Sequence, residues 1–177
     1  MTRYVGLLYS ITLAQGKRVL NAPLGALLEG LGYGGVRTLL ATGNVVFDAP
    51  GDAPRAIEAD VEPAFAKAFG RQIDFIVRSG SDWERLAAVN PFPGQSQADP
   101  SHVIVRVMRE PITPDAARLL AERAGPAEIV RIVGGDPWFF FGAGVAGSKL
   151  TGVMKPGRIG PGTARNWNTV EKIAAAL

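Results

Sequence analysis

The chain has 177 residues, of which 47% are hydrophobic and 20% are charged. This composition is typical of a globular protein, with enough residues for one ordinary domain or for two small ones that share a core. Cysteine is absent, which excludes disulfides, thiolate zinc sites and cysteine nucleophiles, and which is compatible with a reducing cytoplasm.

Positive charge is concentrated near the end of the chain. Five basic residues and one acidic residue follow residue 147, so this segment carries +4 and the rest carries −1, which gives the net charge of +3. A locally basic segment on a neutral body favours a small anion or a phosphate as ligand. It argues against the coating of a long nucleic acid, which needs a broad stripe of phosphate contacts.

The sequence predicts no membrane segment. The apolar stretch from Tyr4 to Leu13 follows Arg3, as in a signal peptide, but polar residues dilute it and no small-x-small cleavage site follows it. No other apolar run approaches the length that spans a bilayer. We therefore expect a buried first strand and a cytoplasmic protein.

The first half of the chain predicts the order strand, helix, hairpin, helix, strand. These elements are a strand at 4–8, a helix from Asn21 to Gly32, β-rich runs at 36–40 and 45–47, a helix from Pro54 to Gly70 and a strand at 73–77. Thr42-Gly43-Asn44 most simply forms the hairpin turn, because glycine and asparagine tolerate positive φ. Pro63 should bend or interrupt the second helix. The order is that of a ferredoxin-like α+β unit.

The second half repeats this order. A capping box from Ser81 to Glu84 opens a short linker helix, and a polar loop follows at 91–100. The later elements are a strand at 102–108, a helix at 113–124, strands at 129–133 and 138–141, and a last helix that starts at Thr163 or Asn168 and runs to Leu177. We predict an α+β fold of two ferredoxin-like βαββα(β) units packed together, at 1–80 and 81–177, with a C-terminal helix.

A glycine-rich turn precedes the basic segment. Gly142-x-Gly144-x-x-Gly147 matches the dinucleotide-binding glycine pattern, and with Ser148-Lys149 it is similar to a phosphate loop whose last two residues are exchanged. The acidic residue and second strand of a dinucleotide-binding unit do not follow, so we expect no cofactor. Backbone N–H groups and the Lys149 ammonium could still bind an anion. The alternative is a flexible turn with an exposed lysine.

Polar residues gather again at 163–170. Arg165 and Asn166 offer donors that could hold a carboxylate or phosphate, whereas Asn168 has capping-box spacing to Glu171 and is explained by capping alone. Trp167 either packs in the core or stacks on a ring, and we favour the core. Asn44, in the predicted hairpin, could present its amide at a site.

Other candidate groups favour structural roles. His102, the one histidine, is expected to be a solvent-facing strand residue, because the sequence puts no carboxylate beside it that would orient a catalytic base. The carboxylates lack metal-ligand spacing, so we expect no metal. The run from Trp138 to Phe141 predicts a strand buried on both faces, and it lacks the basic residues of a base-stacking platform.

Four segments together resemble the bacterial domain-of-unknown-function family 1697. They are Tyr9 to Gly16, Thr42-Gly43-Asn44-Val45-Val46-Phe47, Ser148-Lys149-Leu150-Thr151 and Thr163-Ala164-Arg165-Asn166-Trp167-Asn168-Thr169-Val170. The resemblance implies a compact fold of two α+β units and no established activity. Tyr9, Ser10 and Thr12 replace the arginine, glycine and asparagine of the family's opening loop, which implies that part of any family site is lost or changed. Pro156-Gly157 and Pro161-Gly162 would also break a helix after Thr151.

We predict a small binding protein, or a diverged enzyme, with a site between the two units for a small anionic or phosphate-bearing ligand. The residues expected at this site are Asn44, Gly144, Gly147, Ser148, Lys149, Arg165, Asn166 and Asn168. These residues suffice for binding, but they include no nucleophilic side chain paired with a general base, so the sequence leaves open whether a reaction occurs. Two alternatives remain: a single-stranded nucleic-acid module, and a non-catalytic structural or interaction domain.

Overall fold

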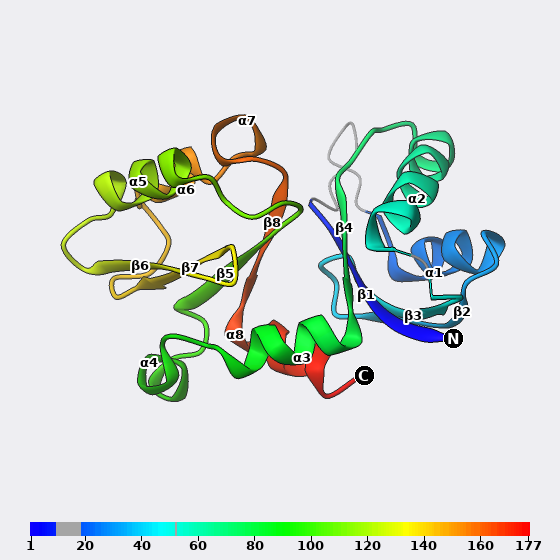
Figure 1. The fold of residues 1–177 in the computed structure, drawn as a ribbon, viewed down its shortest axis with the longest axis horizontal. Coiled ribbons are helices and arrows are strands. Elements are labelled where there is room, and N and C mark those ends of the chain that lie inside the picture. The colour runs from blue at the N-terminus through cyan, green and yellow to red at the C-terminus, as the bar shows by residue number, and fades with distance from the viewer. Residues whose placement is uncertain (10–18, 52) are drawn as a thin grey trace. The chain divides into compact units, whose positions relative to one another are not determined.

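The structure is a computed structural model that describes residues 1–9, 19–51 and 53–177. The chain forms two compact units: unit 1 contains Met1–Arg85 and Lys172–Leu177, and unit 2 contains Leu86–Glu171. Each unit is built on one four-stranded antiparallel sheet with helices, which confirms the α+β fold (Figure 1). The domain boundary expected at residue 80 stays a prediction. Residues 10–16 of the opening loop lie outside the described residues.

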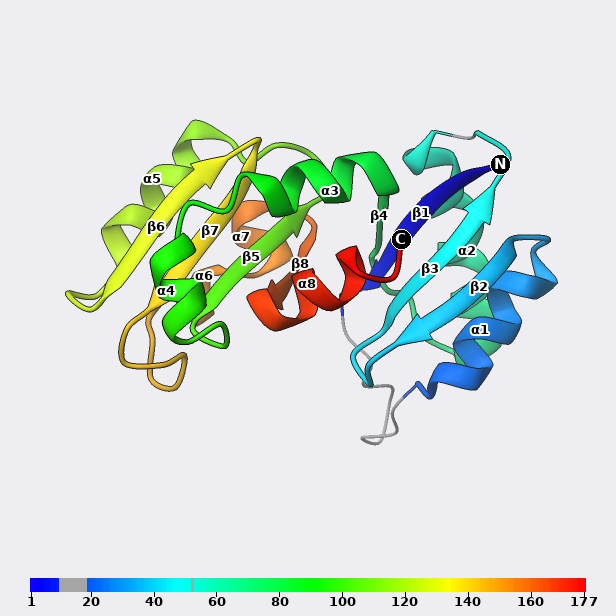
Figure 2. The same ribbon diagram turned by 90° about the horizontal axis from the view of Figure 1, so that it is seen from below.

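Unit 1 has the strand order of a ferredoxin-like fold. Its elements are β1 (Thr2–Leu8), α1 (Asn21–Gly30), β2 (Gly34–Leu39), β3 (Asn44–Ala49), α2 (Pro54–Phe69) and β4 (Phe75–Ser79). The sheet order is β2-β3-β1-β4, and β1 pairs in antiparallel fashion with both β3 and β4. Helices α1 and α2 cover one face of this sheet (Figure 2). The predicted order of elements is therefore confirmed.

The core of unit 1 lies where these helices meet the sheet. Alternate residues of the strands, such as Tyr4 and Phe47, point to the same face and are buried against Leu28 and Phe65 from the helices. Of the bend or interruption expected at Pro63, the interruption is absent, because α2 continues through this residue. Proline has no N–H to donate to the helix carbonyl four residues before it. Because Pro63 is exposed, water can bind that carbonyl instead. The helix ends as predicted at Gly70, with φ of 69°.

The last residues of the chain belong to unit 1. The Arg37 Nη2 atom donates a hydrogen bond of 2.8 Å to the Ala176 carbonyl oxygen. Leu177 lies beside Gly80, because a Cβ added to this glycine would be 3.5 Å from the Leu177 Cδ2 atom. These contacts show why the strand-bearing part of unit 1 and residues 172–177 form one body.

Unit 2 repeats the topology with a different second crossover. Its elements are α4 (Pro93–Ala98), β5 (Val103–Met108), α5 (Pro114–Arg123), β6 (Glu128–Val133), β7 (Asp136–Phe141), α6 (Leu150–Val153), α7 (Pro156–Ile159) and β8 (Gly162–Asn166). The sheet order is β6-β7-β5-β8. Two short helices, α6 and α7, replace the single long helix of unit 1. The helix break expected at Pro156-Gly157 and Pro161-Gly162 is present.

The core of unit 2 confirms one prediction, and a nearby segment corrects another. Trp138, Phe139 and Phe141 are buried as expected, whereas Phe140 is half-buried. The rings of Phe139 and Phe141 stack 5.8 Å apart in the core under α5. The segment 91–100 is not only a loop, because α4 forms within it. Phe92 is buried just before this helix, and the Asn90 Nδ2 atom donates to the Ser96 Oγ atom at 2.8 Å, which together hold the helix in place.

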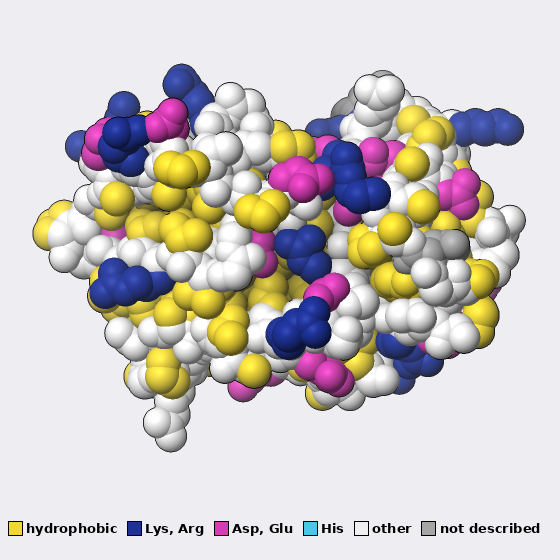
Figure 3. All heavy atoms as spheres, viewed as in Figure 1, with side chains coloured by type: hydrophobic (Ala, Val, Ile, Leu, Met, Phe, Trp, Pro, Cys, Tyr) yellow, Lys and Arg dark blue, Asp and Glu magenta, His cyan; other side chains and the backbone are white. Residues whose placement is uncertain are grey.

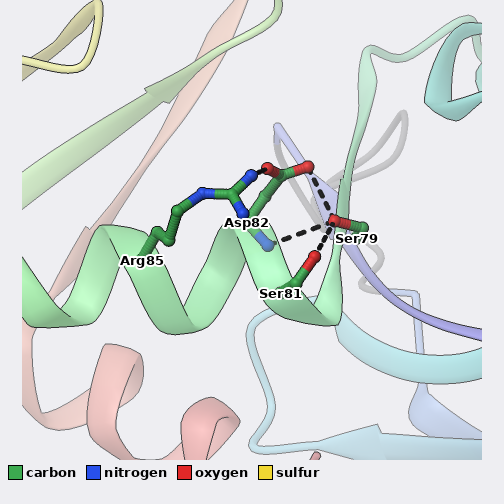
Figure 4. Close-up of polar contacts among 4 residues, drawn as sticks. All are labelled: Ser79, Ser81, Asp82 and Arg85. Carbon is green, nitrogen blue, oxygen red and sulfur yellow. Dashed lines mark hydrogen bonds and ion pairs between the residues drawn. The ribbon is translucent and has the colours of Figure 1, made fainter.

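Helix α3 (Gly80–Ala88) begins two residues earlier than a capping box at Ser81 predicts. Ser79 caps it: the Ser79 Oγ atom accepts from the Asp82 backbone N–H at 3.1 Å and donates to the Asp82 Oδ2 atom at 2.6 Å (Figure 4). Arg85 donates to the other Asp82 oxygen. Strand β4 runs directly into this cap, which explains why Ser79 has the role that was expected for Ser81.

Helices α3 and α8 (Trp167–Ala174) each contain residues of both units. Among the residues that the structure describes, none of the helices has the length and apolar character needed to cross a bilayer.

Two glycine substitutions test the packing of unit 1. We expect Gly6→Ala to destabilise the protein by about 1–3 kcal/mol, because a Cβ there would lie 2.2 Å from the Cζ atom of the buried Phe75 ring. The matched change Gly30→Ala should stabilise it by about 0.5–1 kcal/mol, since Gly30 ends α1 and has open space around it. Urea denaturation followed by circular dichroism measures both. Shifts of the same sign would contradict this packing.

A pair of serine substitutions tests the start of α3. Ser79→Ala should lower the free energy of unfolding by about 1 kcal/mol, because the Asp82 N–H loses its acceptor. Ser81→Ala should have a much smaller effect, since Ser81 contacts only the Ser79 hydroxyl in this cluster. Thermal denaturation of both variants measures these losses of stability. A larger loss for Ser81→Ala than for Ser79→Ala would mean that Ser81 caps the helix, as the sequence predicts.

Candidate functional site

The glycine-rich turn after β7 has a backbone reason for each of its three glycines. A Cβ at Gly142 would lie 2.7 Å from the Ala127 carbonyl oxygen, and the Gly142 N–H donates to that oxygen at 2.8 Å. Gly144 and Gly147 have φ of 81° and 79°, which other residues rarely adopt. The turn is thus required by the fold, and it delivers residues 147–149 to the surface of unit 2.

The glycine-rich turn leads into a helix that is only one turn long. Lys149 precedes α6, which has four residues, so the helix macrodipole there is too small to form an anion site by itself. The Ser148 Oγ atom accepts from the Leu150 N–H at 3.1 Å, and the Thr151 hydroxyl donates to the Ser148 carbonyl at 2.7 Å. These local bonds fix the Ser148 side chain and leave its neighbour Lys149 exposed.

Three of the predicted site residues line one hollow in unit 2. Gly147, Ser148 and Lys149 meet the C-terminal end of α5 and the loop before β6 around a volume of about 540 Å³. The charged residues in the lining are Glu122, Arg123, Glu128 and Lys149. Figure 3 shows side chains of both charge signs gathered over the region of α5. The hollow therefore combines cations, carboxylates and a polar turn.

Sequence analysis missed the α5 side of this hollow. Glu122 and Arg123 are exposed residues at the end of an amphipathic helix, where a charge most often faces solvent without a role. Only the ferredoxin-like topology could have indicated them, because it packs α5 beside the crossover that contains α6. Glu128 is half-buried, and its Oε2 atom accepts from the Gly125 N–H at 2.7 Å.

Arg165 does not line this hollow. Strand β8 holds it in a buried position, 8% exposed, where its Nη1 atom donates to the Thr163 Oγ1 atom and to the Ala164 carbonyl oxygen, both at 2.7 Å. Burial lowers the pKa of Arg165 to about 10, so it is still protonated at neutral pH. Arg165 and Trp138 both pair with Val105 and therefore share one face of the sheet.

Asn166 caps the last helix, which corrects the start predicted at Thr163 or Asn168. The Asn166 Oδ1 atom accepts from the Thr169 N–H at 3.1 Å and from its hydroxyl at 2.9 Å. Because β8 extends to Asn166, α8 begins at Trp167. Thr163 lies in the strand, and Asn168 is exposed in the first turn of α8. The ring of Trp167 packs 6.1 Å from that of Trp138.

Asn44 belongs to unit 1 and holds its hairpin. It is fully buried at the start of β3, and its Nδ2 atom donates to the Leu39 carbonyl oxygen at 3.1 Å and to the Thr42 hydroxyl at 2.7 Å. The preceding Gly43 has φ of 70°, as the turn prediction requires. The expectation that all eight residues serve one ligand site stays a prediction.

His102 has a neighbouring carboxylate that the sequence did not indicate. Its Nδ1 atom lies 3.6 Å from the Asp99 Oδ2 atom, and its imidazole is half-buried just before β5. A hydrogen bond from Ser101 is the largest cause that lowers the pKa of Asp99, and His102 adds a smaller electrostatic contribution. Among the described residues, no group of three or more histidine or carboxylate side chains is placed to hold a metal ion.

A conservative substitution tests the structural role of Arg165. Arg165→Lys should lower the free energy of unfolding by about 1–2 kcal/mol, because both hydrogen bonds come from the Nη1 atom, which the shorter lysine side chain does not reach, and because an ammonium is more strongly hydrated and costs more to bury. The control, Arg158→Lys on the exposed side of α7, should be neutral. Chemical denaturation measures both. Equal stability of the two variants would mean that these two hydrogen bonds add nothing to the fold.

Comparison with known proteins places the chain in a family. A model described as "Protein of unknown function (DUF1697)" matches residues 1–138, which include the Asn44 hairpin but end before the glycine-rich turn. The solved structure of the conserved bacterial protein SP0830 from Streptococcus pneumoniae is similar, with a TM-score of 0.75 and 22% identity over 98% of this chain and 97% of that one. This likeness concerns the fold. No curated protein matches the chain. The chain belongs to the DUF1697 family of proteins of unknown function.

Proposed function

We propose that this protein binds a small phosphate-bearing ligand in the hollow of unit 2 beside residues 147–149. One observation carries the proposal: the predicted residues Gly147, Ser148 and Lys149 share a hollow of about 540 Å³ with a second cation, Arg123. A volume of this size is within the range of small-molecule sites, roughly 300–1,000 Å³. Two cations beside a polar turn suit the oxygens of a phosphate.

The binding is expected to be weak and sensitive to salt. Lys149 and Arg123 are exposed, so their attraction for an anion is reduced by water to about 1 kcal/mol for each charge at 4 Å. Screening at physiological ionic strength acts over about 8 Å and reduces it further. A ligand that must be bound tightly would need further contacts, which the apolar and backbone parts of the hollow could supply.

The lining favours binding over catalysis. Ser148 is the one hydroxyl residue among the lining residues, and its Oγ atom accepts a hydrogen bond from the Leu150 N–H. The lining contains no histidine that could act as its base. Binding therefore explains the site with fewer assumptions than a reaction. The absence of cysteine fits a reducing cytoplasm, where we propose that the protein acts.

A second function, a non-catalytic structural domain, has its own support. Asn44, Arg165 and Asn166 donate to or accept from their own hairpin, strand and helix start. The polar closing motif would then stabilise the fold without a ligand. The nucleic-acid alternative has no comparable support, because Trp138, Phe139 and Phe141 on β7 are buried and cannot stack on bases.

Titration with pyrophosphate distinguishes the two functions. We expect saturable shifts of the backbone amide NMR signals of residues 147–149 at low salt, weakened about fivefold in Lys149→Gln because one charged contact is lost. Lys155→Gln removes the same charge from an exposed position outside the lining and should leave the affinity unchanged. Equal affinity of the wild type and Lys149→Gln, or no saturable shift at all, would leave only the structural function.

A further inference from the structure

The hollow of unit 2 is lined by as many carboxylates as cations. Arg123 and Lys149 carry positive charge, and Glu122 and Glu128 carry negative charge. Among the described residues, the side chains of Arg123, Lys149 and Glu122 make no hydrogen bond or ion pair with another residue. The four charges thus line one hollow without the opposite signs neutralising each other, which leaves both signs available to a ligand.

A ligand with only negative charge matches the two cations of this lining but not its two carboxylates, so it binds weakly. Its attraction to Lys149 and Arg123 is reduced by repulsion from Glu122 and Glu128, because all four residues line the same hollow. A ligand with only positive charge meets the same difficulty with the signs exchanged. Electrostatic complementarity requires both signs on the occupant.

The carboxylate of Glu128 is the best-held of the four groups. It is half-buried, and its Oε2 atom accepts from the Gly125 N–H at 2.7 Å. Its orientation is therefore fixed before a ligand arrives, which reduces the entropy lost on binding. Glu122, in the last turn of α5, supplies the second carboxylate of the lining. Both features favour an ammonium there.

We propose that the occupant of this hollow is a zwitterion, a small phosphate ester that also carries a protonated amine. The inference rests on the proposed function and adds the amine to it. The phosphate contacts Lys149 and Arg123 beside the turn at 147–148. The amine contacts the carboxylates of Glu122 and Glu128. Phosphate recognition alone would not require the carboxylates.

Three related probes test this inference. O-Phosphoethanolamine carries both groups, ethyl phosphate lacks the amine, and ethanolamine lacks the phosphate. We expect isothermal titration calorimetry and NMR titration of the full chain at low salt to show phosphoethanolamine binding about tenfold more tightly than either of the others. A tenfold ratio of affinities corresponds to one additional charge-assisted contact, which is the amine in the comparison with ethyl phosphate and the phosphate in the comparison with ethanolamine.

The Glu128→Gln variant makes the test specific. Glutamine keeps an oxygen that can accept from the Gly125 N–H, so the loop is retained while the charge is removed. This variant should bind phosphoethanolamine about tenfold more weakly and ethyl phosphate at least as tightly as the wild type does, because repulsion of the phosphate is relieved. Glu171→Gln, an exposed change on α8 outside the lining, should alter neither affinity.

The outcomes separate the inference from the function on which it rests. If ethyl phosphate binds as tightly as phosphoethanolamine, or if Glu128→Gln weakens both phosphates equally, the amine is not recognised and the inference is overturned while phosphate binding stands. If ethanolamine binds as tightly as phosphoethanolamine, the phosphate is not recognised and the inference is also overturned. If none of the three probes binds, both proposals fail.

Discussion

The first strand of each sheet in chain order is hydrogen-bonded on both sides, and this double pairing determines where the remaining elements lie. Strand β1 pairs with β3 and β4, and β5 pairs with β7 and β8. Because the first strand of each unit lies between the third and the fourth strand of that unit, the chain must cross over one face of the sheet twice. The helices on that face bury the apolar residues that alternate along the strands, and this burial is the main stabilising term of each unit.

The two units satisfy the same constraint with different crossovers, and the difference produces the hollow. In unit 1 the second crossover is α2, a continuous helix of 16 residues that covers its part of the sheet. In unit 2, glycine and proline divide the crossover into the turn at 142–149 and the short helices α6 and α7. Short helices cover less of the neighbouring helix, so the end of α5 remains beside an open volume. The glycine and proline residues that divide this crossover into short helices therefore also create the candidate site.

The sequence was sufficient for the order of elements because that order depends on periodicity and on glycine and proline, which act locally. It was insufficient for the exact starts of α3 and α8. At Ser79 and Asn166 a strand continues to the residue that caps the next helix, and how far a strand continues depends on its pairing partners. The site was harder still, since Glu122, Arg123 and Glu128 meet Lys149 only through the packing of α5 beside the crossover.

Arg165 and Lys149 illustrate why a motif cannot assign a function by residue type alone. Both are cations in the same basic segment, and the sequence predicts that both bind an anionic ligand. Arg165 is 8% exposed and donates to its own strand, so its charge is compensated by the fold that buries it. Lys149 is exposed, has no partner among the described residues and lines a hollow. A ligand gains most from a charge that the protein has not already used, which is why the proposed site centres on Lys149 and on the carboxylates beside it.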